Sequence, residues 1–142
     1  MSLNGKVIVG DPLIGNYPAE IDATDDGASV DFDGYGSLVV AIQTIGGVGG
    51  TNPELDGKIQ ESPDGGSWFD VEGATFTRVV ASNKSQAIVF NRTMRYLRHN
   101  RVVAGISPTF VLTVSFIPLD PTECIYTNGE RCVYGNTRRV LV

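Results

Sequence analysis

The 142-residue sequence has little of the residue types on which most catalytic and metal sites depend: two Cys, one His and one Trp. Two cysteines and one histidine do not supply the usual four ligands of a zinc site. No apolar run approaches the ~20 residues that a membrane-spanning helix needs, so no membrane partner is expected. The first six residues carry one positive charge and no long apolar block. We therefore expect no signal peptide and synthesis in the cytoplasm.

The single histidine, His99, lies in a strand-like run between Arg98 and Arg101. Flanking positive charge lowers the basicity of an imidazole, which argues against a general base. We expect a surface or interface histidine. The acidic pattern at Asp31 and Asp33 lacks the further ligands and flanking helices of a calcium loop. The sequence thus predicts no catalytic residue, no metal and no cofactor.

Glycines and prolines recur about every eight to twelve residues, with short runs of β-branched and aromatic residues between them. No window keeps apolar positions at helical spacing. The predicted strands are residues 6–9, 28–32, 37–44, 57–62, 68–71, 75–80, 87–90, 95–104, 109–117, 124–126 and 131–134. So many strands predict an all-β, two-layer antiparallel β-sandwich that is jelly-roll-like, because one open sheet would leave a face and two edges exposed.

The ends of the chain differ from its middle in composition. Residues 1–27 are rich in Asp, Gly and Pro, and a pair of prolines follows residue 117. We therefore divide the chain into an extended N-terminal arm (1–27), a β-sandwich domain (28–119) and a C-terminal hairpin and tail (120–142). Both ends are expected to be arms or edge elements on the sandwich or on a neighbour. The glycine-rich residues 46–50 are expected to form a flexible loop.

The side-chain patterns of two predicted strands indicate which of their faces are buried. Residues 109–117 alternate, with their largest side chains on one face, which indicates a strand that lines the core. Residues 37–44 are apolar on both faces, which suits a central strand covered on each side by a sheet or a neighbouring subunit.

Residues 59–71 predict a hairpin. Pro63 presets φ for the turn, and the glycines after Asp64 accept the positive φ that such a turn needs. Trp68 follows the turn and is expected to enter the core.

The two cysteines, Cys124 and Cys132, flank a turn whose length decides their relation. A two-residue turn at Asn128 and Gly129 places the thiols on opposite faces of the ribbon and excludes a disulfide. A three-residue turn that begins at Thr127 places them directly opposite each other, and a bridge becomes feasible. The expected lack of a secretory signal favours reduced thiols.

The net charge of −5 is divided very unevenly between the two halves of the chain. Residues 1–70 carry twelve acidic side chains against two lysines, a net charge of −10. Residues 71–142 carry nine basic side chains against four acids, a net charge of +5. Such separation favours attraction between copies of the chain, or attraction to an oppositely patterned surface.

Arginines recur at every third residue from 92 to 101. In a strand this spacing alternates between the two faces, so these arginines do not form one stripe along a phosphate backbone, and we expect no nucleic-acid partner. We interpret them as interface residues that form salt bridges to acidic segments of a partner or sister subunit, with a solvated surface as the alternative. The candidate interface residues are Arg92, Arg95, Arg98, Arg101, Arg138 and Arg139.

A family resemblance appears between residues 55 and 116. The hairpin of 55–71, the segment 73–77, the Arg-Tyr-Leu-Arg run of 95–98, the segment 105–109 and a final alternating strand resemble small structural proteins of the head modules of tailed bacteriophages. These resemble capsid decoration, or cement, proteins. The Ser-x-Asp-Gly-x-x-Trp hairpin with its Arg-Tyr-x-Arg strand also resembles discoidin-like carbohydrate-binding modules.

The first resemblance implies a non-enzymatic sandwich on the outer surface of the capsid, with the major capsid protein and other copies of the chain, often as trimers, as its partners. The second implies an alternative, a sugar-binding or receptor-binding module of a virion surface, for which Trp68 and Tyr96 are the obvious aromatic candidates. A third hypothesis for the function is another phage structural subunit with a similar sandwich fold, such as a tail-tube or head-completion subunit.

Overall fold

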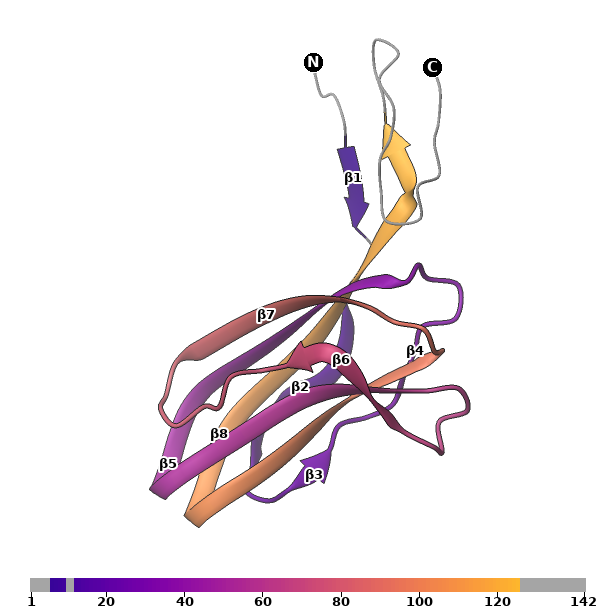
Figure 1. Cartoon of the computed structure of the whole chain (residues 1–142). Coiled ribbons are helices and arrows are strands. Elements are labelled where there is room, and N and C mark those ends of the chain that lie inside the picture. Colours follow the sequence, from indigo (N-terminus) through magenta and orange to yellow (C-terminus); the bar gives the residue numbers. More distant parts are fainter. Residues whose placement is uncertain (1–5, 10–11, 126–142) are drawn as a thin grey trace.

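The computed structural model describes residues 6–9 and 12–125, and this part of the chain is all-β and antiparallel, with no helix (Figure 1). Its strands are β1 (Lys6–Val9), β2 (Leu13–Ile21), β3 (Asp25–Asp26), β4 (Val30–Asp31), β5 (Leu38–Ser62), β6 (Phe69–Thr75), β7 (Lys84–Asn91) and β8 (Tyr96–Ile125). Over the same residues there is accordingly no helix that could cross a membrane.

Two long strands organise the molecule. β5 has 25 residues and β8 has 30, and they pair antiparallel from Val39↔Pro118 to Ser62↔Tyr96. Figure 1 shows both strands turning sharply at the same end of the body. The register shifts three times between Ile45 and Glu54, which marks the bend as a series of β-bulges.

Glycine permits this bend. Gly50 and Gly105 have φ angles of +97° and +122°, and a Cβ at either position would collide with the backbone of the other strand. The prediction of a flexible loop at residues 46–50 is therefore wrong. Val48 and Gly49 pair with Phe110 and Thr109 inside the sheet. A glycine-rich composition is shared by loops and by bulged, bent strands, so composition alone did not distinguish them.

The bend divides the sheet into two parts. In the first sheet half, the order is β7, residues 38–45 of β5, residues 110–118 of β8, and β2. In the second sheet half, the order is β6, residues 54–62 of β5, residues 96–104 of β8, and then β3 and β4. Every strand except β1 is thus attached to the β5–β8 ribbon on one side of the bend.

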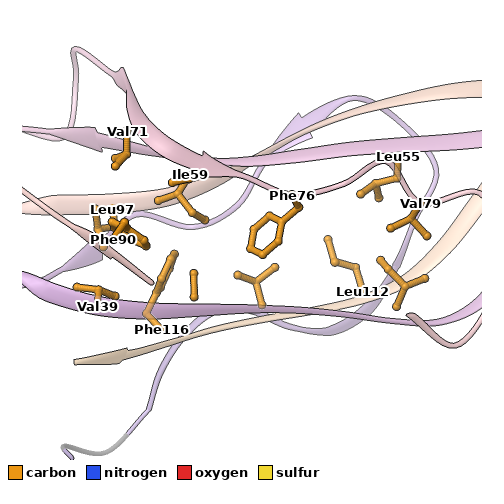
Figure 2. Close-up of a cluster of buried hydrophobic side chains, with 14 of the residues drawn as sticks. Val39, Leu55, Ile59, Val71, Phe76, Val79, Phe90, Leu97, Leu112 and Phe116 are labelled. Atoms are coloured by element: carbon orange, nitrogen blue, oxygen red, sulfur yellow. The ribbon is translucent and has the colours of Figure 1, made fainter. Parts of the chain in front are cut away.

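The hydrophobic core is built from both halves. Val39 and Phe116 of the first half share one buried cluster with Leu55, Ile59 and others of the second. Figure 2 shows these side chains filling the space between the ribbons. The predicted core face of residues 109–117 is confirmed, because its four inward side chains are fully buried. Each such side chain stabilises the fold by roughly 1.5–3 kcal/mol relative to an exposed position.

The predicted hairpin is confirmed, since Gln60 pairs with Asp70 and Glu61 with Phe69 around a turn in which Gly65 has a φ of +79°. The expectation for Trp68 is wrong. Its side chain is only partly buried and lies outside the core cluster. The strand that follows it, β6, begins at Phe69, and Val71 is the first residue of this strand whose side chain is buried.

The two ends differ in how they join the body. Residues 13–21, inside the predicted N-terminal arm, form β2, an edge strand of the first sheet half. Among the described residues, β1 pairs with the final part of β8 alone, from Val9↔Leu119 to Lys6↔Ile125, and Figure 1 shows this two-stranded ribbon leaving the body. Cys132 and the predicted strand at 131–134 lie outside the described residues.

Candidate functional site

A band of charged and amide side chains crosses the outer face of the second sheet half, and we call it the outer network. At one side, Lys58 Nζ and Gln60 Nε2 donate to the carboxylate of Asp70 at 3.0 and 2.9 Å. These bonds, the one from Gln60 first, lower the pKa of Asp70. Arg98 Nε then donates to Gln60 Oε1 at 2.9 Å, which carries the band from β5 to β8.

Arg98 is the centre of the outer network. One of its terminal nitrogens lies 3.3 Å from Oδ2 of Asp26 on β3, and Asn100 Nδ2 donates to the other oxygen, Oδ1, at 2.7 Å. The guanidinium carbon of Arg98 stands 4.3 Å from the centre of the Trp68 ring, within cation–π range. The network, made of Asp26, Lys58, Gln60, Asp70, Arg98 and Asn100, therefore spans four strands.

Arg95 is fully engaged with the acidic segment that precedes β5. Its Nε and one terminal nitrogen donate to the two carboxylate oxygens of Asp31, both at 2.9 Å, and Asp33 lies 3.9 Å away. The bond from Arg95, followed by that from the backbone N–H of Asp33, lowers the pKa of Asp31 to about 2. The pair is bidentate but exposed, so its role is to fix geometry more than to add stability.

Arg92 contacts no carboxylate oxygen within salt-bridge distance among the described residues. Its guanidinium instead donates to the backbone carbonyls of Phe32, Tyr35, Gly36 and Met94. These bonds fasten the turn between β4 and β5 to the segment before β8. Arg92 is therefore a structural residue of this end of the sheet.

His99 lies inside the fold, and the expectation of a surface histidine is wrong. Its ring is fully buried, and Nε2 lies 2.7 Å from Oε1 of Gln43, which is also fully buried. Since the amide oxygen accepts, Nε2 carries the proton. Burial, and secondly the charge of Arg101, lower the pKa of His99 to about 3. A Cβ on Gly57 would collide with both polar atoms, so glycine makes room for this bond.

Arg101 is the second titratable residue, after His99, on the buried face of β8. Its side chain is 4% exposed, and one terminal nitrogen donates to Asn16 Oδ1 at 3.1 Å. The carboxylate of Asp25 lies 3.8 Å away at the rim. Burial lowers the pKa of Arg101 against the opposing effect of Asp25 and Asp26.

Glu61 is a buried acid that the sequence analysis did not single out. Its carboxylate accepts hydrogen bonds from the Thr93 N–H at 2.8 Å, the Thr93 hydroxyl at 3.0 Å and the Met94 N–H at 3.1 Å. It shares strand parity with Ile59, which was a signal that it faces inward.

The four arginines from 92 to 101 do not form one patch. Arg98 points outward and Arg101 inward, as strand alternation predicts. Each of the four has its own partners in the same chain. The acidic half and the basic half therefore meet within the molecule, through pairs such as Arg95 with Asp31 and Arg78 with Asp56. Arg138 and Arg139 lie outside the described residues.

We next consider where the described residues could hold a metal ion or a small molecule. Within residues 6–9 and 12–125, no three His, Cys, Asp or Glu side chains converge on a point that could hold a metal ion. A hollow of about 420 Å³ opens between β7 and the segment after β6, lined by residues that include Arg78, Val80, Lys84 and Gln86. Gln86 is already bonded to the backbone of Thr77 in both directions.

No known protein-family model matches the sequence, and no curated protein matches it either.

Proposed function

We propose that this chain is a virion structural protein that decorates and stabilises the outside of a tailed-phage capsid. One observation carries the proposal: the ribbon of β1 and the end of β8 projects beyond the body (Figure 1). A subunit that must hold a lattice together needs an element that reaches past its own boundary. The resemblance of residues 55–116 to decoration proteins points in the same direction.

The proposed architecture is a jelly-roll-like two-layer β-sandwich. The folding back of the β5–β8 ribbon supports it, because side chains from both halves enter one core cluster. Such a body is a rigid base for lattice contacts and needs no catalytic group. We therefore propose a non-enzymatic protein without a cofactor or metal.

The proposed partners are the major capsid protein and further copies of the chain, in a small homo-oligomer of the trimeric kind that the resemblance implies. Neither nucleic acid nor membrane belongs to this proposal. Many weak contacts of this kind add up on a lattice through multivalency. The proposed place of action is the capsid surface of the virion.

Cosedimentation with purified capsids tests the function. The full chain should pellet with capsids to saturation, and a variant without residues 1–9 should lose most of this binding while its melting temperature changes little. Val102→Lys, on the body and away from the ribbon, is the matched control and should bind like the full chain. Equal binding by the shortened variant would overturn the role of the ribbon, and absence of binding by the full chain would overturn decoration.

The glycan-binding alternative depends on Trp68 and Tyr96. Each ring has an arginine over one face, Arg98 at 4.3 Å and Arg95 at 5.2 Å. A sugar that stacked on either ring would have to use the opposite face or displace a guanidinium. A glycan array separates the alternatives, because decoration predicts no hits.

A further inference from the structure

The outer face of the first sheet half carries no charged side chain on its three adjacent strands β5, β7 and β8. Alternation of burial along the strands identifies the outward positions. These are Leu38, Val40, Ile42 and Thr44 on β5, Ser85, Ala87, Val89 and Asn91 on β7, and Val111, Thr113, Ser115 and Ile117 on β8. We call these positions the uncharged face.

The apolar members of this face are direct neighbours. Val40 lies opposite Val89 on one side and Ile117 on the other. Side chains opposite each other on one face of antiparallel strands are in contact range. Val89 is 60% exposed, and Val40 and Ile117 are partly exposed. The centre of the face is therefore a continuous apolar strip across three strands that is open to solvent in the single chain.

The same two long strands carry a different surface beyond the bend. There, β5 presents Glu54, Asp56 and Lys58 outward, and β8 presents Arg98. Sheet faces that stay in water ordinarily alternate apolar inward with polar outward. The second sheet half has charged side chains across its outer face, whereas on the first half a charge stands at the β2 edge, where Glu20 lies opposite Val111. This contrast marks the uncharged face as a surface that is covered in the working assembly.

The edge beside this face is also open. β7 pairs with β5 through eight consecutive residue pairs without a register shift, and it contains no proline and one charge, Lys84. Edge strands that remain solvent-exposed are usually protected by charges, prolines or bulges. β2, at the opposite edge, has Pro18 and two register shifts. Beyond Lys84 at its first position, the edge of β7 has none of these protections.

We propose that the uncharged face, with the edge of β7, is buried against a second copy of this chain. The lack of charge on this face restricts which partner can cover it. A partner must be uncharged where it covers this strip, since an unpaired charge buried there is strongly unfavourable. A second copy brings such a face, and apolar sheet faces of neighbouring copies can meet around the axis of the small oligomer proposed above. Other approaches bring together charged surfaces of chains whose net charge is −5.

This inference rests on the self-association included in the proposed function, and it replaces the arginine contacts expected from the sequence. Among the described residues, Arg92, Arg95 and Arg98 are engaged with acids and carbonyls of their own chain. The apolar strip, not the opposed charges, is then the contact between copies. Self-association should accordingly be nearly insensitive to salt, because screening acts on charges.

Light scattering on the full chain, with a matched pair of variants, tests the inference. Val89→Lys places a charge in the uncharged face, whereas Val102→Lys places the same charge on the second sheet half. Both positions are exposed strand valines, at 60% and 48%, so both variants are expected to fold. Val111→Lys on β8 is a second variant of the face, and melting temperatures confirm folding.

We expect Val89→Lys and Val111→Lys to have the mass of a single chain and Val102→Lys to keep the mass of the unmodified oligomer. An oligomer that survives both face variants would overturn the inference and leave decoration intact. Variants that stay oligomeric but no longer pellet with capsids would instead assign the face to a capsid subunit. A monomeric unmodified chain would also overturn it, and capsid cosedimentation of that monomer shows separately whether decoration holds.

Discussion

His99 and Gln43 join the two sheet halves by a single hydrogen bond in the core. Nε2 of His99, on the second half, lies 2.7 Å from Oε1 of Gln43, on the first, and both side chains are fully buried. The bond passes over Gly57, whose missing side chain provides the space. A buried polar contact of this kind favours one alignment of the halves, because any shift would leave both groups without a partner.

The first prediction concerns acid stability. The pKa of folded His99 is about 3, below its ordinary value of 6.5, so the neutral ring stabilises the fold fully above pH 6.5 and this contribution is lost as the pH falls toward 3. The free energy of unfolding should decrease by up to about 1.4 kcal/mol per pH unit in this window. In His99→Gln this slope should be absent, which urea unfolding between pH 6.5 and 4.5 measures.

Asp31→Asn is the control for that experiment, since the folded pKa of Asp31, about 2, affects stability only at lower pH. Between pH 6.5 and 4.5 it should keep the slope of the unmodified protein. Identical slopes in His99→Gln and the unmodified protein would contradict the assignment.

The second prediction concerns the space above Gly57. In Gly57→Ala, the new methyl group would collide with Gln43 and His99, and we expect a loss of about 1–3 kcal/mol in the free energy of unfolding. Gly46→Ala is matched to it, because the nearest atom to a Cβ there is 3.7 Å away. Chemical denaturation should show almost no change for Gly46→Ala, and equal losses in both variants would refute the role of Gly57.

The third prediction concerns Glu61. Glu61→Ala removes the acceptor of two backbone N–H groups and one hydroxyl, so stability should fall by about 1–3 kcal/mol. Glu72→Ala, on the exposed side of β6, should cost far less. Hydrogen exchange at Thr93 and Met94 gives a local readout. Unchanged protection of both amides in Glu61→Ala would show that the carboxylate does not hold this segment.

The fourth prediction concerns the exposed Arg95–Asp31 pair. Replacement of Arg95 by Met removes the two donors that lower the pKa of Asp31, so this pKa should rise from about 2 toward the ordinary 3.8. Carboxyl-carbon NMR titration measures it directly. A pKa that stays near 2 would mean that the N–H of Asp33 holds the carboxylate without help.

Local sequence patterns predicted several of the strands. A strand that they missed, β2, is set by its pairing with a distant part of the chain. Residues 109–117 have an uninterrupted period of two, so their core face followed from the sequence. β2 was missed because Asn16, Pro18 and Glu20 interrupt its apolar residues. The pairing of β2 with β8, about a hundred residues away, overrides this weak local pattern.

In the candidate site, too, the local arrangement was predictable from the sequence and the long-range partners were not. The alternation of Arg98 and Arg101 between faces was predictable, but their partners were not, because Asp26 and Asn16 come from strands distant in the sequence. For His99, the arginines beside it suggested a surface. Its parity with buried Leu97 was the better indicator, since every second residue of a strand shares one face.

Electron cryomicroscopy of capsids incubated with the full chain tests the proposed decoration most directly. The account predicts regular density on the outer capsid surface that fits the folded β5–β8 body, with the β1–β8 ribbon in contact with a neighbouring subunit. Bare capsids at saturating protein, or density confined to the tail or to the inside of the shell, would contradict it.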